Sequence, residues 1–203
     1  MIKNIVFDNG GVIVKYSAET YLDYFGYSKE KQKVLDQLFV SDEWGVFAKG
    51  KMTSDEFKSY ALDRFPEYRK EVLEILDVNN LKFMIPPYKE TLGFIKDLKK
   101  SGYNVYLLSD INEDTIKYLN DEIAGFEKLF DGVVYSCRVG MVKKDGHVFK
   151  YLLDTYSLVP EETLFLDDSI RNLHEAQKYS IQTYRFFDPN EDIPQIKLLI
   201  NKK

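Results

Sequence analysis

The chain has 203 residues, with 28 lysines and arginines against 33 aspartates and glutamates, which gives a formal net charge of −5 at pH 7. That length fits one domain, or one domain with a modest insertion, and an apolar fraction of 44% is enough to form a hydrophobic core. Because the chain is acidic and has no long basic run, we expect neither nucleic acid nor an anionic membrane surface as a partner.

The cysteine content and the N-terminal segment limit the expected compartment. Cys137 is the only cysteine, so the sequence offers neither an internal disulfide nor an all-cysteine zinc site. Asp8 interrupts the N-terminal apolar stretch after a few residues, which is not the pattern of a signal peptide or a membrane span. We therefore expect a cytoplasmic protein, monomeric or weakly homodimeric, that does not bind membranes.

The first predicted element is a strand at residues 5–7, a wholly apolar run. Runs this short and apolar are typical of strands that are buried on both faces, as in a parallel sheet. Residues 16–86 contain no comparable run. They show apolar residues at helical spacing over 34–39 and a helix-capping box formed by Thr53 and Glu56. We predict an all-helical insertion over 16–86, which two prolines close.

From residue 88 onward, helical patterns and apolar runs alternate. An amphipathic helix is expected over 88–100, with Gly102 as its C-cap. Two further buried strands are predicted at residues 105–108 and 164–166. Two further helices are predicted at residues 148–153 and 173–179. This alternation predicts an α/β fold with right-handed crossovers and a doubly wound parallel sheet. We assign the sheet to residues 1–15 and 87–203, and a cap domain to residues 16–86.

Each of the three predicted strands stops at a small polar or acidic side chain. Asp8 follows the first strand, Ser109 and Asp110 follow the second, and Asp167 and Asp168 follow the third. Aspartate and serine often end strands and start turns, so one such residue carries little information. In an open parallel sheet, however, ligands bind at the carboxyl ends of the strands, and all of these residues together favour one shared site.

A group of carboxylates at this edge would require a counter-charge. Two carboxylates about 4 Å apart repel each other by ~4 kcal/mol at an effective dielectric constant of about 20. A divalent cation relieves this repulsion, and an oxygen-only ligand set is suited to Mg²⁺. Hydroxyl and lysine donors beside such a cation predict phosphoryl transfer, with a carboxylate as the nucleophile.

Four segments resemble, in the correct order, the four motifs of the haloacid dehalogenase superfamily. They are residues 5–13 (IVFDNGGVI), 107–110 (LLSD), 140–143 (GMVK) and 165–169 (FLDDS). The resemblance covers essentially the whole chain and implies a Rossmann-like core with a helical cap inserted after the first motif. The opening segment is most similar to bacterial sugar-phosphate phosphatases such as the alpha-glucose-1-phosphate phosphatases.

The resemblance also implies which residues carry the reaction. Asp8 would be the nucleophile, and Lys143 would neutralise both the nucleophile and the phosphate. Ser109 would bind the transferring phosphoryl group, and Asp110, where the family often has asparagine, would help to orient it. Lys144 stands where the family often has proline, so either lysine is a candidate for the phosphate site, and we favour Lys143 on motif alignment.

The same resemblance implies a magnesium site. Asp8, Asp167 and Asp168 would supply carboxylate ligands, and the backbone carbonyl of Gly10 would supply another. Asn172 matches a polar position in the fourth motif that commonly supports this cluster.

Gly10 is also the main departure from the family pattern. Phosphatases of this family usually carry an aspartate there, which protonates the leaving oxygen and later activates water. Loss of a general acid–base typically lowers a rate by ~10²–10⁴-fold. The sugar-phosphate phosphatases that this chain resembles share the glycine, which favours a working enzyme. A cap residue, a substrate hydroxyl, solvent or Asp110 would then carry the proton.

We therefore predict a magnesium-dependent phosphomonoester hydrolase that forms an aspartyl-phosphate and acts on a small sugar phosphate. One alternative is a haloacid dehalogenase, which attacks carbon and needs no metal, and the Asp167–Asp168 pair counts against it. The other is a non-catalytic phosphate-binding protein that lost turnover with the change to Gly10. Within the predicted cap, Trp44 and Phe47 are expected to pack in the core rather than contact substrate.

Overall fold

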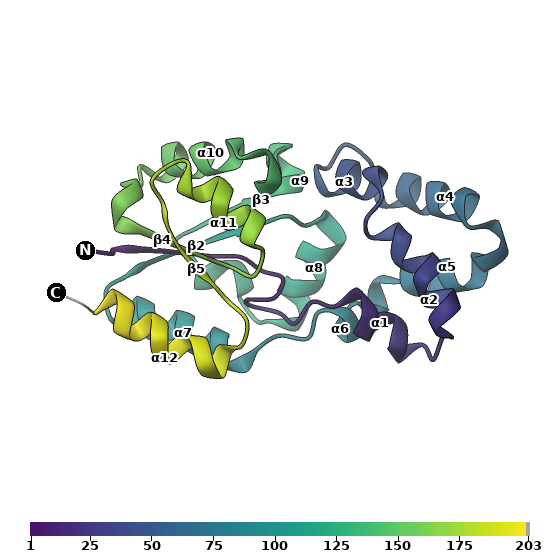
Figure 1. The fold of residues 1–203 in the computed structure, drawn as a ribbon, viewed down its shortest axis with the longest axis horizontal. Coiled ribbons are helices and arrows are strands. Elements are labelled where there is room, and N and C mark those ends of the chain that lie inside the picture. Colours follow the sequence, from purple (N-terminus) through teal and green to yellow (C-terminus); the bar gives the residue numbers. More distant parts are fainter. Residues whose placement is uncertain (202–203) are drawn as a thin grey trace.

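The computed structural model describes residues 1–201, and within them the chain forms one five-stranded parallel sheet (Figure 1). The strands are β1 (Asn4–Phe7), β2 (Asn104–Ser109), β3 (Gly132–Tyr135), β4 (Thr163–Asp167) and β5 (Gln182–Arg185). Their order across the sheet is β3-β2-β1-β4-β5, so β1 is the central strand, with β2 and β4 as its parallel neighbours. The predicted α/β fold with a parallel sheet is confirmed.

Helices cover both faces of this sheet. They are α7 (Lys89–Lys100), α8 (Glu113–Glu122), α9 (Ser136–Val139), α10 (His147–Tyr156), α11 (Ile170–Gln177) and α12 (Pro189–Ile200). α10 and α11 lie on one face, and α7 and α12 lie on the other (Figure 1). No described helix combines the length and the apolar character that crossing a membrane requires.

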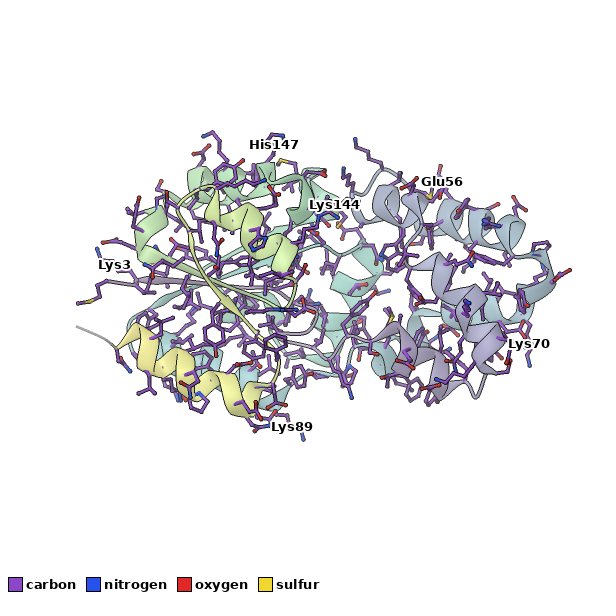
Figure 2. All side chains as sticks on the ribbon, viewed as in Figure 1. Lys3, Glu56, Lys70, Lys89, Lys144 and His147 are labelled. Atoms are coloured by element: carbon purple, nitrogen blue, oxygen red, sulfur yellow. The ribbon has the colours of Figure 1, made fainter. Side chains whose placement is uncertain are left out.

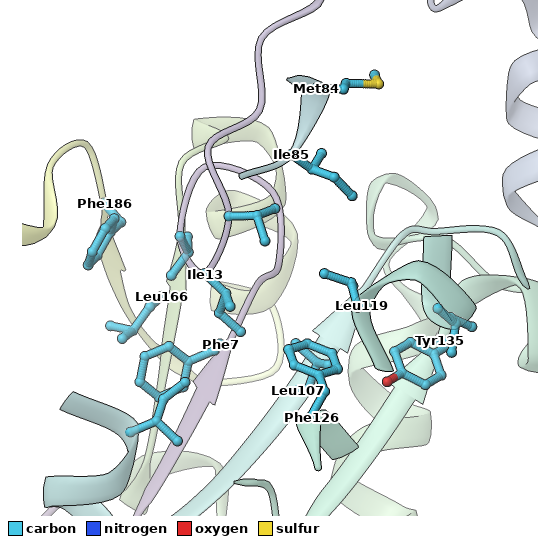
Figure 3. Close-up of a cluster of buried hydrophobic side chains, with 14 of the residues drawn as sticks. Phe7, Ile13, Met84, Ile85, Leu107, Leu119, Phe126, Tyr135, Leu166 and Phe186 are labelled. Atoms are coloured by element: carbon cyan, nitrogen blue, oxygen red, sulfur yellow. The ribbon is translucent and has the colours of Figure 1, made fainter. Parts of the chain in front are cut away.

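Side chains along each strand alternate between two buried clusters. Ile5 and Phe7 join the cluster that includes α7 and α12, whereas Val6 joins the cluster that includes α10 and α11. Figure 3 shows part of the first cluster, with Phe7, Leu107 and Leu166 contributed by three neighbouring strands. Because both faces are covered, these strands have no polar side, which is why they are unbroken apolar runs in the sequence.

Two strands are absent from the prediction. β3 has the sequence GVVY and β5 has QTYR, and each lies at an edge of the sheet. The residues of β5 are only half-buried or exposed. An edge strand does not have to be apolar on both sides, so β5 lacks the pattern that indicates the central strands. In β3, residues 133–135 do form a short apolar run, which the prediction missed.

Residues 16–86 form helices and contain no strand. The helices are α1 (Ala18–Tyr24), α2 (Lys29–Leu35), α3 (Asp42–Ala48), α4 (Ser54–Arg64), α5 (Arg69–Ile75) and α6 (Leu81–Met84). The predicted capping box is present at the start of α4, where the Thr53 side chain accepts from the Glu56 amide and the Glu56 side chain accepts from the Thr53 amide. These helices lie to one side of the sheet, away from the chain ends (Figure 1).

Several polar contacts hold this helical segment against the rest of the protein. Ser136 Oγ donates to the carbonyl of Ala48 at 2.6 Å, and Lys49 Nζ lies 2.6 Å from a carboxylate oxygen of Asp145. Gly50 has a φ of +66°, and a Cβ there would lie 2.0 Å from the carbonyl oxygen of Cys137. Only glycine therefore permits the close approach of these two backbones.

Candidate active site

The site lies where the strand order changes direction, between β1 and β4. The chain passes from β1 to β2 on one side of the sheet, and β4 returns to the other side of β1. Phe7 is paired with Leu166, so the next residues, Asp8 and Asp167, leave neighbouring strands side by side. The Asp8 amide donates to the carbonyl of Leu166 at 2.9 Å, which fixes this position. A crevice at such a switch point is where open α/β sheets bind ligands.

Lys143 bridges the two aspartates. Its Nζ lies 2.6 Å from Asp8 Oδ1 and 2.7 Å from Asp167 Oδ2, and the residue is only 2% exposed. The Lys143 amide donates to both carboxylate oxygens of Asp110 at 3.1 Å, so Asp110 positions the backbone that carries the lysine. Lys144, the other candidate, is exposed on the surface (Figure 2).

A third carboxylate completes the cluster. Asp8, Asp167 and Asp168 each present an oxygen atom, and these three atoms lie within 4.8 Å of one another. Gly11 has a φ of +74°, and a Cβ there would lie 2.7 Å from Asp168 Oδ2, so the loop approaches Asp168 closely only because it has no side chain. Asn172 Nδ2 donates to Asp167 Oδ1 at 3.1 Å and holds that carboxylate in place.

This cluster contains more negative charge than its single ammonium can balance. Burial raises the pKa of Asp8 well above its usual range, although Lys143 acts to lower it. Burial and then the charge of Asp167 raise the pKa of Asp168. Burial alone would lower the pKa of Lys143, but Asp8, Asp167 and Asp110 outweigh it and raise that pKa. An oxygen-only donor set with excess negative charge fits a hard divalent cation such as Mg²⁺.

Ser109 adds an unused hydroxyl beside these charges. It ends β2, is 1% exposed, and its Oγ has no hydrogen-bond partner within residues 1–201. A buried hydroxyl without a partner is costly unless a ligand or a water satisfies it. Because the hydroxyl can donate, an anion such as phosphate would satisfy it.

These side chains form the floor of a cavity of about 360 Å³. Asp8, Gly10, Ser109, Lys143 and Asp168 contribute to its lining, and so does Asp110. Asp167 is completely buried and joins the cluster from beneath. The opposite wall is formed by side chains from α3 to α6 and the segments that connect them. The residues selected from the sequence thus lie together at one end of this cavity.

Most residues of the cavity wall are absent from the sequence prediction, among them Tyr16, Lys58 and Asp77. Tyr16 packs over Gly10: a Cβ built on Gly10 would lie 3.5 Å from the Tyr16 Cβ, in ordinary van der Waals contact. Lys58 and Asp77 line the opposite wall from the helical segment. No spacing rule could have selected them, because a helix pattern does not indicate which face turns toward a distant sheet. Trp44 and Phe47 both pack in the hydrophobic cluster and line the cavity.

The comparisons with known proteins assign the family. A family model described as haloacid dehalogenase-like hydrolase matches residues 2–178. Because this match covers most of the chain, the protein belongs to the haloacid dehalogenase-like hydrolases, as the motifs predict.

Particular relatives are similar over nearly the whole length. The chain is 28% identical over 193 residues to the D-ribitol-5-phosphate phosphatase of Bacteroides thetaiotaomicron, covering 91% of this chain and 92% of that protein. It is 24% identical to a sesquiterpene phosphatase of Aspergillus oryzae, with 86% and 85% covered. A solved haloacid dehalogenase-family enzyme of B. thetaiotaomicron, in complex with magnesium and inorganic phosphate, superposes with a TM-score of 0.70 at 25% identity, covering 91% of this chain and 94% of that one. The special likeness to alpha-glucose-1-phosphate phosphatases stays a prediction.

Proposed function

We propose that this protein is a magnesium-dependent phosphatase that hydrolyses small phosphomonoesters through a phosphate ester on Asp8. The observation that carries the proposal is the buried cluster in which Lys143 Nζ lies 2.6 Å from Asp8 Oδ1, beside two further carboxylates and the unpartnered Ser109 hydroxyl. A phosphatase among the relatives and a related structure that holds magnesium and inorganic phosphate support it.

Asp8 is the nucleophile of the proposed reaction. Its Oδ1 accepts from the Asn9 amide at 2.6 Å and contacts Lys143, which leaves Oδ2 available for a second partner. A carboxylate oxygen of Asp8 attacks phosphorus, the bond from phosphorus to the ester oxygen breaks, and that oxygen leaves with a proton as the alcohol. Water then attacks the phosphorus of the acyl phosphate, which releases inorganic phosphate and restores the Asp8 carboxylate.

The other site residues hold the charges in place. Lys143 offsets the charge of Asp8 and donates toward phosphate, and Ser109 donates its free hydroxyl to a phosphoryl oxygen. Asp8, Asp167, Asp168 and the Gly10 carbonyl would hold Mg²⁺. When bound, the cation neutralises carboxylates and phosphate oxygens, and so lets the two anions approach. Asp110 positions the backbone of Lys143. In this proposal, Asp110 also helps to orient the phosphoryl group.

Turnover should depend on the metal. Removing divalent cations with a chelator should reduce phosphate release from para-nitrophenyl phosphate by at least about 10²-fold, because the carboxylates would then repel the phosphate. Readdition of Mg²⁺ should restore it. A dehalogenase would release halide from 2-haloacids whether or not chelator is present. A phosphate-binding protein would bind phosphate without releasing it from any ester.

Substitution of Gly10 tests how the leaving group is protonated. A Cβ at Gly10 would meet Tyr16 at 3.5 Å, an ordinary van der Waals contact, so the backbone there accepts a side chain. Gly10→Asp should raise kcat for alkyl phosphates by about 10-fold or more, since an alkoxide needs a proton to leave. The same change should leave kcat for para-nitrophenyl phosphate within about threefold, because nitrophenolate leaves without one. An equal effect on both esters would show that proton supply does not limit the wild-type rate.

We further propose that residues 16–86 act as a cap that encloses the substrate over a core of residues 1–15 and 87–203. Residues 16–86 contain helices only, and side chains of α3 to α6 form the wall opposite the carboxylates, which supports this division. One relative is named for a polyol phosphate and another for a sesquiterpene. Family membership therefore does not determine which alcohol the substrate releases. The sugar phosphate predicted from sequence is one candidate. A cytoplasmic monomer or weak homodimer remains the expectation for its state in the cell.

A further inference from the structure

The cavity has two chemically distinct ends. One end holds the carboxylates, Lys143 and Ser109. The opposite wall is predominantly apolar, and the side chains that give it this character include Phe39, Trp44, Phe47, Leu76, Leu81 and Met84. Two of them belong to α3, where Trp44 and Phe47 pack edge to face with ring centroids 5.9 Å apart. The part of a substrate that is furthest from its phosphate would therefore contact the carbon atoms of these apolar side chains.

Most polar groups on that wall already have partners within the protein. The Ser54 hydroxyl donates to Asp114. Asp77 Oδ1 accepts from the Asn79 amide at 2.9 Å, and Thr115 of α8, which also lines the cavity, donates its Oγ1 to Asn112 Oδ1 at 3.0 Å. The bonds of Asp77 and Thr115 stabilise helix starts, and the bond of Ser54 joins α4 to α8, so breaking any of them to bind substrate would cost stability.

The exceptions on this wall, within the described residues, are the second carboxylate oxygen of Asp77, because both hydrogen bonds to that side chain end on Oδ1, and the ammonium of Lys58. Within residues 1–201 its ammonium forms no ion pair, and its side chain is half-buried. A single ammonium on a long aliphatic stem can place its charge in water while its methylenes cover apolar surface. One ammonium and one free carboxylate oxygen do not supply the several donors and acceptors that a chain of hydroxyls requires.

A polyol phosphate would thus bury hydroxyls against a wall with few free hydrogen-bonding groups, and unpaired buried hydroxyls are unfavourable. An alkyl or isoprenoid chain has no such groups, and it gains free energy by leaving water. Each methylene buried contributes about 0.8 kcal/mol, which corresponds to about fourfold in affinity.

We infer that the preferred substrate is a phosphomonoester with an apolar, alkyl or isoprenoid, leaving group, whose chain occupies the wall formed by α3 to α6. This inference rests on the proposed phosphatase function for the cleaved bond. It concerns the alcohol part of the substrate, which is bound by different residues from those that hold the phosphate.

The first test measures binding without turnover. Trp44 is the only tryptophan and lines the cavity, so its fluorescence should report occupation of the apolar wall. A series of n-alkylphosphonates from methyl to octyl, titrated in the presence of Mg²⁺, should bind about fourfold more tightly per added methylene until the cavity is full. An affinity that does not change with chain length would overturn the inference.

A matched pair of leucine variants provides the control. Leu76, at the end of α5, lines the cavity, whereas Leu73, one turn earlier on the same helix, is 43% exposed to solvent. Leu76→Asn should reduce the ratio of hexylphosphonate to methylphosphonate affinity by about 10-fold, while Leu73→Asn should leave this ratio unchanged. Equal effects of the two substitutions would contradict the assigned wall. Because each ratio is measured within one protein, a general loss of stability does not mimic the expected result.

Turnover separates this inference from the proposed function. With Mg²⁺, hexyl phosphate should be hydrolysed with a kcat/KM at least about 10-fold above that of D-ribitol 5-phosphate. A preference for ribitol phosphate, with phosphate released from both esters, would overturn the inference of an apolar leaving group. It would still support the proposed phosphatase function. A rising phosphonate series without phosphate release from any ester, para-nitrophenyl phosphate included, would support the apolar wall and overturn the phosphatase.

Discussion

Replacing Asp8 with asparagine should lower phosphate release by at least about 10⁴-fold while the protein stays folded. The amide is nearly isosteric with the carboxylate, and Asn9 and Lys143 can still contact its oxygen. It carries no negative charge and is a poor nucleophile, however, so no acyl phosphate forms. Losses of this size are typical when the nucleophile of a covalent mechanism is removed.

Steady-state phosphate release, together with thermal unfolding, measures this outcome. Asp154→Asn is the matched control, because the Asp154 carboxylate lies on the exposed side of α10 and pairs only with Lys150 in the described structure. This control should keep its rate within about twofold. Acid quenching of the wild-type protein during turnover should also trap a phosphorylated peptide that contains Asp8. A rate close to that of the wild type for Asp8→Asn would show that another group attacks phosphorus.

Replacing Lys143 with methionine should destabilise the metal-free protein by about 3–5 kcal/mol. The ammonium is buried between Asp8 and Asp167, and its removal leaves buried carboxylates with no cation between them. Methionine fills a similar volume, so the loss reports charge rather than a cavity. The variant should also lose turnover, because the phosphate and the nucleophile would no longer be neutralised.

Denaturant unfolding with and without Mg²⁺ tests this prediction. Magnesium should stabilise Lys143→Met more than it stabilises the wild type, because the cation replaces part of the missing positive charge. Lys144→Met is the neighbouring control on an exposed side chain, and it should change the free energy of unfolding by less than about 0.5 kcal/mol. Equal destabilisation by the two substitutions would mean that Lys143 is not the lysine that balances the cluster.

The sequence by itself determined the three central strands of the sheet and the position of its reactive edge. Strands buried on both faces must be short and wholly apolar, so β1, β2 and β4 could be recognised without any partner being known. The polar residue that ends each run then lies at the carboxyl edge of a parallel sheet by geometry alone. This is why Asp8, Ser109 and Asp167 could be selected as a group. β5, a half-exposed edge strand, had no such signal.

Only the tertiary structure decided what surrounds that edge. Motif alignment favours Lys143 over its neighbour Lys144, but only the structure shows that Asp110, 33 residues earlier in the chain, holds the Lys143 amide while Lys144 is exposed. The apolar wall that faces the phosphate end depends on which side of α3 to α6 turns toward the sheet. The physical reason is that burial, charge neutralisation and cavity shape are properties of contacts between distant segments. A local pattern encodes the period of an element, but it does not encode which other element will cover it.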